Sequence, residues 1–171
     1  MQLTMSRASL PVMRHYLEVL AALLVRAEQH VLGGGGDPAT VLDSRLVADM
    51  YPLRAQVQFA CDFAKGAVAR LGQHDVPRFA DDEQSFADLA QRIAATLAII
   101  DQADPPRFDD REEKEIALTF AGQPMAFGGA DYLTLFALPS MLFHISIAYA
   151  LIRAAGVPIG KADFLGDLPL F

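Results

Sequence analysis

Apolar residues recur at three- and four-residue steps along four long segments of the chain, as they do in helices that bury one face. The segments cover residues 10–32, 52–71, 82–103 and 131–153. The first helix is expected to open at Ser9 or Leu10, because Pro11 then lies in the first turn, where its missing N–H costs nothing. The four glycines at 33–36 are expected to end it.

Polar residues in front of the second and third segments predict where those helices begin. Asp49 can cap the second helix, with Pro52 near its first turn, and Gly72 stops it. Asp81 is expected to cap the third helix, with Gln84 placed to complete a capping box.

A two-residue alternation replaces the helical pattern between the third and fourth segments. In EEKEIALTF (112–120) the apolar residues Ile116, Leu118 and Phe120 alternate with small or polar ones, and the chain turns at 121–124 before returning. This pattern predicts a small β-hairpin. A short helix over 39–45 and an extended tail that packs back through Phe164 complete the expected elements.

These elements predict an all-α protein, an antiparallel four-helix bundle with a small β-hairpin before the last helix, forming a single domain over residues 1–171. The last helix has no charge between Asp131 and Arg153, so a membrane span of roughly 20 residues is an alternative. The polar residues Ser140 and His144 inside the stretch disfavour a membrane span. The other helices are amphipathic and need an apolar partner for their buried faces, which favours a central helix of a soluble bundle.

Composition narrows the setting and the partners. The net charge of -7 disfavours nonspecific binding of nucleic acid, and no membrane partner is expected. The single cysteine, Cys61, rules out an intrachain disulfide and fits a reducing cytoplasm. The N-terminus lacks the long apolar region of a signal peptide. An apolar content of 53% exceeds what one small bundle hides, which predicts a homodimer.

His144 is the candidate for chemistry, because it is the only ionisable side chain inside the uncharged stretch. Helical spacing puts the small residue Ser140 next to it, which leaves room for a pocket that binds a ligand. Asp62, Gln56 and Gln58 on the second helix are the candidate partners of its imidazole, since a carboxylate commonly orients a histidine. The alternative for these three residues is a helix flank that faces solvent. The alternative for His144 is a core histidine whose hydrogen bond only supports packing.

The same residues do not predict a metal site or any other cofactor. A tight site needs about three suitable ligands, and only His144 and Asp62 are available near the candidate pocket. The other histidines, His15, His30 and His74, are scattered, and no pair has HxxxH or HxH spacing.

Three stretches in combination carry a resemblance to a known family. They are RLVADMYPLRAQVQFACDFAKG (45–66), DYLTLFALPSMLFHISIAYALIR (131–153) and GVPIGKADFLG (156–166). The chain resembles an uncharacterised domain-of-unknown-function family (number nineteen ninety-three) of the DinB-like superfamily. One departure is Ser140, where the family pattern usually has asparagine after the proline.

The resemblance implies an antiparallel four-helix bundle that is commonly dimeric. Better-known DinB-like relatives hold a divalent metal with one histidine on helix two and an HxxxH pair on helix four, and some are thiol-dependent transferases. Here position 148 is alanine, position 140 is serine and the second helix has no histidine, so the metal chemistry does not carry over. Two functions are expected: a small-molecule binding protein or divergent transferase-like enzyme with a pocket near His144, or a non-catalytic dimeric helical protein whose polar core is structural.

Overall fold

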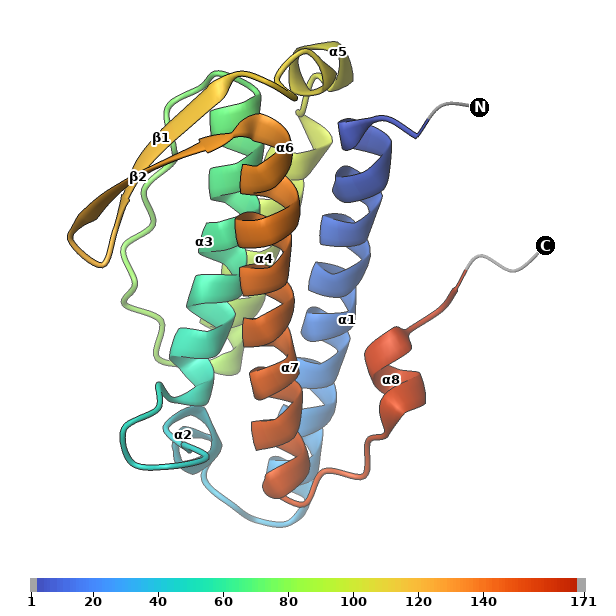
Figure 1. The fold of residues 1–171 in the computed structure, drawn as a ribbon. Helices are drawn as coiled ribbons and strands as arrows, with labels where there is room; N and C mark the ends of the chain where they lie inside the picture. The colour runs from blue at the N-terminus through green and yellow to red at the C-terminus, as the bar shows by residue number, and fades with distance from the viewer. Residues whose placement is uncertain (1–2, 169–171) are drawn as a thin grey trace.

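The protein is mostly helical, with one small antiparallel sheet of two strands, in a computed structural model that describes residues 3–168. Four long helices lie side by side (Figure 1). They are α1 (Met5–Gly33), α3 (Leu53–Leu71), α4 (Phe86–Asp101) and α7 (Leu138–Ala154). The shorter elements are α2 (Pro38–Leu42), α5 (Pro105–Asp109), α6 (Gly129–Asp131), α8 (Lys161–Leu165) and the strands β1 (Glu115–Phe120) and β2 (Gln123–Gly128).

The long helices enclose one apolar core, in which α3 packs against α4 and α7, and α1 packs against the same two helices. Helix α3 runs antiparallel to α7, because Gln56 near its start bonds His144 while Arg70 near its end bonds Tyr132. Helices α3 and α4 instead run in the same direction, and Arg54 in the first turn of α3 bonds the residues just before α4.

The parallel pair α3 and α4 departs from the antiparallel order expected from the sequence. Residues 72–85 form the connector, and Figure 1 shows it returning along the length of α3. Such a segment spans up to about 45 Å when extended, whereas α3 is only about 28 Å long, so the chain has the length to return before α4 begins.

Helix α1 begins at Met5 rather than at Ser9 or Leu10, so Pro11 lies inside it. The extra turn has its own support. Thr4 is the N-cap, and the Asp109 carboxylate accepts hydrogen bonds from the Ser6 backbone N–H and hydroxyl at 2.6 and 2.8 Å. A partner distant in sequence therefore offsets the hydrogen bond that the proline removes.

The expected caps of the second and third long helices are wrong. Helix α3 has Pro52 at its N-cap position and no side-chain cap, so Asp49 does not fill that role. Helix α4 begins at Phe86 and is capped by Ser85, which forms a capping box with Asp88. Asp81 instead pairs with Arg92, a contact that neighbouring residues in sequence cannot indicate.

The predicted β-hairpin is present, with Ile116 opposite Phe127 and Leu118 opposite Met125. Ala121 and Gly122 form its two-residue turn, both with positive φ, as hairpins of this length favour. The hairpin continues into α6, where Gly129 lies so close to the Arg111 carbonyl that a Cβ there would be 1.9 Å from its oxygen. This close approach fixes where the hairpin joins the last long helix.

The last long helix is interrupted by a π-helical segment, η1 (Tyr132–Ala137), between α6 and α7. Two stretches, Met5–Gly33 and Gly129–Ala154, are long and apolar enough to cross a membrane by length and composition, a test that core helices of soluble proteins also pass. The tail was expected to be extended, but it contains α8, and Phe164 packs between Tyr16 and Tyr149 at ring distances of 5.4 and 5.7 Å.

Candidate functional site

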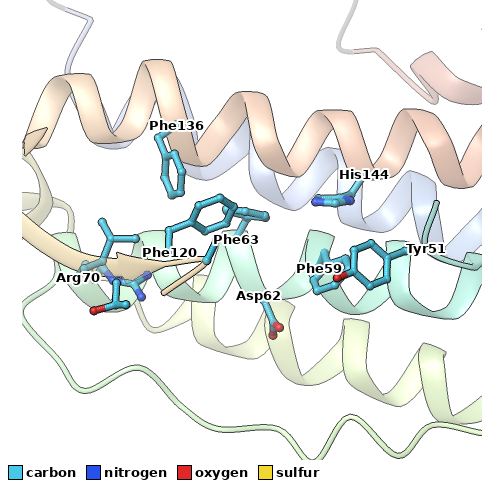
Figure 2. Close-up of a pocket in the computed structure, with 11 residues that line it drawn as sticks. Tyr51, Phe59, Asp62, Phe63, Arg70, Phe120, Phe136 and His144 are labelled. Carbon is cyan, nitrogen blue, oxygen red and sulfur yellow. The ribbon is translucent and has the colours of Figure 1, made fainter. Parts of the chain in front are cut away.

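A pocket of about 420 Å³ lies between α3, the helix that follows Gly129 and strand β1 (Figure 2). Aromatic side chains form most of its wall. It is lined by Tyr51, Phe59, Asp62, Phe63, Arg70, Leu118, Thr119, Phe120, Ala121, Phe136 and His144. Tyr51 and Phe120 are 59% and 45% exposed, so the lining reaches the surface and the pocket is open to solvent. Its volume is in the range of sites that hold small organic molecules.

His144 projects from α7 into this pocket, and its imidazole is oriented by Gln56 on α3. The His144 Nδ1 lies 2.7 Å from Gln56 Oε1. The amide of Gln56 is itself fixed, because its Nε2 donates to the Tyr51 carbonyl at 3.0 Å. An amide oxygen only accepts hydrogen bonds, so Nδ1 must carry the proton of the neutral ring. The lone pair then lies on Nε2.

Aromatic rings surround the imidazole and keep it uncharged. Phe63 stacks on it with ring centres 5.6 Å apart and planes 17° apart, and Phe59 lies 5.0 Å away. Burial lowers the pKa of His144 from its usual 6.5 to about 4, because the charged form loses hydration and no carboxylate replaces it. Nε2 has no hydrogen-bond partner among residues 3–168. His144 therefore offers the pocket a free hydrogen-bond acceptor at neutral pH.

Asp62 lines the pocket but does not orient His144. Its Oδ1 accepts from Lys65 one helical turn away and from Arg92 on α4 at 2.6 Å. Arg92 is almost completely buried, with its side chain 2% exposed, and it also pairs with Glu83 at 2.7 Å. The buried guanidinium needs carboxylates around it, which draws Asp62 toward α4 and leaves the uncharged Gln56 facing the imidazole.

Two other predicted site residues lie outside the pocket. Gln58 donates to a Glu83 carboxylate oxygen at 2.6 Å, so it ties α3 to the connector before α4. Ser140 is half-buried one turn before His144 on α7, but it is not part of the pocket lining. Of the predicted residues, the structure brings together His144 and Gln56 and places Asp62 on the neighbouring wall.

Sequence reasoning missed the aromatic wall and Arg70. The signal was present, because Phe59, Phe63, Gly66 and Arg70 follow one another at three- and four-residue steps along α3. This spacing alone does not indicate a pocket, because nothing in the sequence shows where the hairpin strand that completes the pocket packs. In the structure Phe120 of that hairpin lies 6.3 Å from Phe63, measured between ring centres, and closes the wall.

Cys61 is close to the pocket in sequence but is not available for chemistry. Its side chain is fully buried on the core face of α3. Burial raises the pKa of the Cys61 thiol to about 11, so at neutral pH it is a small apolar group and not a nucleophile.

The fold and the pocket define a class: a mostly helical protein with a small two-stranded sheet and a solvent-open aromatic pocket beside a neutral histidine. The chain belongs to the family described as Domain of unknown function (DUF1993), whose model matches residues 5–165. This confirms the family that the sequence motifs indicate. No curated protein matches the chain.

A solved structure gives the same picture of the fold. The chain is similar to the crystal structure of a DinB family member protein from Shewanella denitrificans, with 32% sequence identity and a TM-score of 0.89. The match covers 97% of this chain and 94% of that one. At this identity and coverage the likeness extends over the whole domain.

The residues of this chain do not fit the three-histidine metal site that the resemblance implied. Ala148 is buried in the core one turn after His144, and α3 contains no histidine. Within residues 3–168, no three His, Cys, Asp or Glu side chains gather in a way that could hold a metal ion. The described residues therefore do not supply the ligand set of that metal site.

Proposed function

We propose that this protein binds a small organic molecule in the aromatic pocket, with His144 Nε2 accepting a hydrogen bond from it. One observation carries the proposal: Gln56 fixes the imidazole so that its unprotonated nitrogen is left without a partner among the described residues. The Nε2 atom is not among the buried polar atoms without a partner, so in the open pocket it is accessible to a donor that a ligand carries. We also propose that the four long helices constitute a DinB-like four-helix bundle. In this bundle, α3 and α7 contribute residues to the wall of the pocket.

The neutral histidine supports binding over proton transfer. A general base works best when its pKa lies near the working pH. The pKa of His144 is about 4, so the ring is a weak base that still accepts hydrogen bonds well. A transferase-like reaction, as in some DinB-like relatives, would need another group to activate the nucleophile, and the Cys61 thiol is too buried to serve.

A thermal-shift screen of small aromatic compounds with and without O–H or N–H donors tests the proposal. His144→Asn is the informative variant, because the asparagine amide can still donate to Gln56 while the Nε2 acceptor is removed. Donor-bearing ligands of the wild type should lose at least about tenfold in affinity, the worth of one buried hydrogen bond. His30→Asn, at the exposed end of α1, is the matched control and should bind normally.

Binding that survives His144→Asn unchanged would contradict the assigned role of the imidazole. If the screen yields no ligand whose binding depends on the pocket residues, the result counts against the proposed function as a whole. Phe63→Ala serves as the second variant here, since it opens the wall without touching the hydrogen bond between His144 and Gln56.

A second candidate function, that of a non-catalytic homodimer, is favoured by the outer face of the last long helix. Leu135, Pro139, Phe143 and Ser146 are exposed at three- and four-residue steps, and Leu135 and Phe143 are 71% and 55% exposed. An uncharged stripe of this kind is typical of a surface that another protein covers. We propose a homodimer through this face. Light scattering at micromolar concentration should give a dimer mass, and Phe143→Glu should give a monomer.

A further inference from the structure

The end of the pocket away from His144 contains an arginine whose position is set by its neighbours. Arg70 lies in the last turn of α3, and its Nη1 donates to the Tyr132 hydroxyl at 3.1 Å. The guanidinium lies across Gly66, where a Cβ would be only 2.5 Å from the same nitrogen. Glycine at this position therefore leaves the space in which the Arg70 head rests beside the pocket.

The charge of Arg70 is not balanced by a carboxylate within residues 3–168. Among these residues its only hydrogen bond is to the neutral hydroxyl of Tyr132. The other cations around α3 are compensated, because Lys65 and Arg92 both pair with Asp62. A guanidinium has five N–H donors and its planar fork matches a carboxylate. Arg70 therefore presents an uncompensated positive charge and free donors to a pocket whose other charged lining residue, Asp62, is already paired with Lys65 and Arg92.

The two polar ends of the pocket are separated by aromatic wall. Arg70 follows Phe63, the ring stacked on His144, by seven residues, which corresponds to about 10 Å along the helix axis. Phe120 and Phe136 lie between, with their ring centres 5.3 Å apart. Figure 2 shows these rings between the Arg70 end and the His144 end. A flat, apolar body of about this length would contact the rings throughout.

We infer that the pocket binds a flat aromatic carboxylate, with the carboxylate at Arg70 and an O–H or N–H donor at the opposite end bonded to His144 Nε2. The inference rests on the proposed function and names its ligand class. Neutral molecules of the same shape would exclude water from the Arg70 guanidinium without pairing its charge, and organic cations would be repelled by it.

Isothermal titration calorimetry with three matched probes tests the inference: 4-hydroxycinnamate, its methyl ester and 4-methoxycinnamate. The wild type should bind the acid about tenfold or more tighter than the ester, because charge-assisted bidentate bonds form only with the carboxylate. The methoxy acid, which lacks the donor, should bind about tenfold more weakly than the hydroxy acid.

Two variants assign the preference to Arg70. Arg70→Gln should reduce the preference for acid over ester to near unity, while Arg107→Gln, which alters an exposed arginine on α5, should leave it unchanged. Gly66→Ala is the second route, because the added methyl displaces the guanidinium while keeping the charge. It should weaken binding of the acid more than that of the ester. Circular dichroism verifies that each variant is folded.

The outcomes separate this inference from the proposed function. Equal binding of acid and ester by the wild type, or an acid preference that survives Arg70→Gln, would overturn the carboxylate assignment and leave the pocket's binding role standing. If these probes do not bind but the thermal-shift screen yields ligands that need His144, the ligand class is wrong and the binding function stands. If neither experiment yields a ligand, both fail together.

Discussion

Replacing His144 by asparagine is expected to abolish a loss of stability that the wild-type protein shows in mild acid. In the folded protein burial holds the pKa of His144 at about 4, whereas the unfolded ring has its ordinary value of 6.5. Between these values the unfolded chain binds a proton that the folded chain does not, so the free energy of unfolding falls as the pH falls. Above pH 6.5 both states are neutral and the contribution disappears.

The size of the effect follows from the two pKa values. Each pH unit between them is worth about 1.4 kcal/mol, so at pH 5 the full difference would be about 2 kcal/mol. One edge of the ring faces a solvent-open pocket, and screening there reduces the expected loss to about 1 kcal/mol. The asparagine side chain of the variant would not titrate, because an amide has no pKa in this range, yet it can keep the bond to Gln56.

Urea denaturation of the wild type, His144→Asn and His30→Asn at pH 7.5 and pH 5 measures the difference. The wild type should lose about 1 kcal/mol more than His144→Asn between the two pH values, while His30→Asn should follow the wild type. Other titrating groups cancel in the comparison. A gap between wild type and His144→Asn that is the same at both pH values would refute the buried, neutral histidine. A wild type that instead gains stability relative to His144→Asn as the pH falls from 7.5 to 5 would indicate a carboxylate partner.

Four other experiments, two of them substitutions, test separate parts of the structure. Gly129→Ala should cost at least about 2 kcal/mol in urea melts, because the new methyl meets the Arg111 backbone carbonyl, which cannot move aside cheaply. Arg92→Met should cost about 2–4 kcal/mol, since the carboxylates around it lose their shared cation. Cys61 should react with a thiol reagent only after unfolding, given a pKa of about 11 and a fully buried side chain. Elemental analysis of untagged protein should give far less than one equivalent of zinc or nickel, and one equivalent would contradict the metal-free interpretation of the site.

Local patterns predicted the helices and the hairpin, but not how the helices are oriented or where they begin. The three- and four-residue periodicity is a property of each segment alone, so it located α1, α3, α4 and the last helix. The direction of α4 depends on how the connector packs, which no local pattern encodes. The early start of α1 depends on Asp109, a residue about a hundred positions away that supports the first turn. Tertiary partners of this kind override the prior set by a single proline.

The candidate site was likewise predictable from the sequence only in part. His144 stood out because an ionisable group in an apolar helix must find a partner, and Gln56 was among the partners considered. The choice between Gln56 and Asp62 was decided by Arg92, which lies on a different helix and competes for the carboxylate. Arg70 was missed although its spacing from Phe63 was visible, because an arginine near the end of a helix ordinarily only interacts with the helix dipole.

The π-helical segment η1 accommodates one residue more than an α-helix would need for the same rotation, because six π-helical residues turn about as far as five α-helical ones. Phe136 lies within this segment and His144 lies beyond it. Deleting one residue between Tyr132 and Ala137 would let the segment close to an α-helix, while the two halves of the last long helix kept about the same orientation around their common axis. The deletion would shift the side chains inside the segment relative to the pocket wall and leave the packing of α7 in place. A change of one residue in chain length could thus redefine which molecules the pocket accepts.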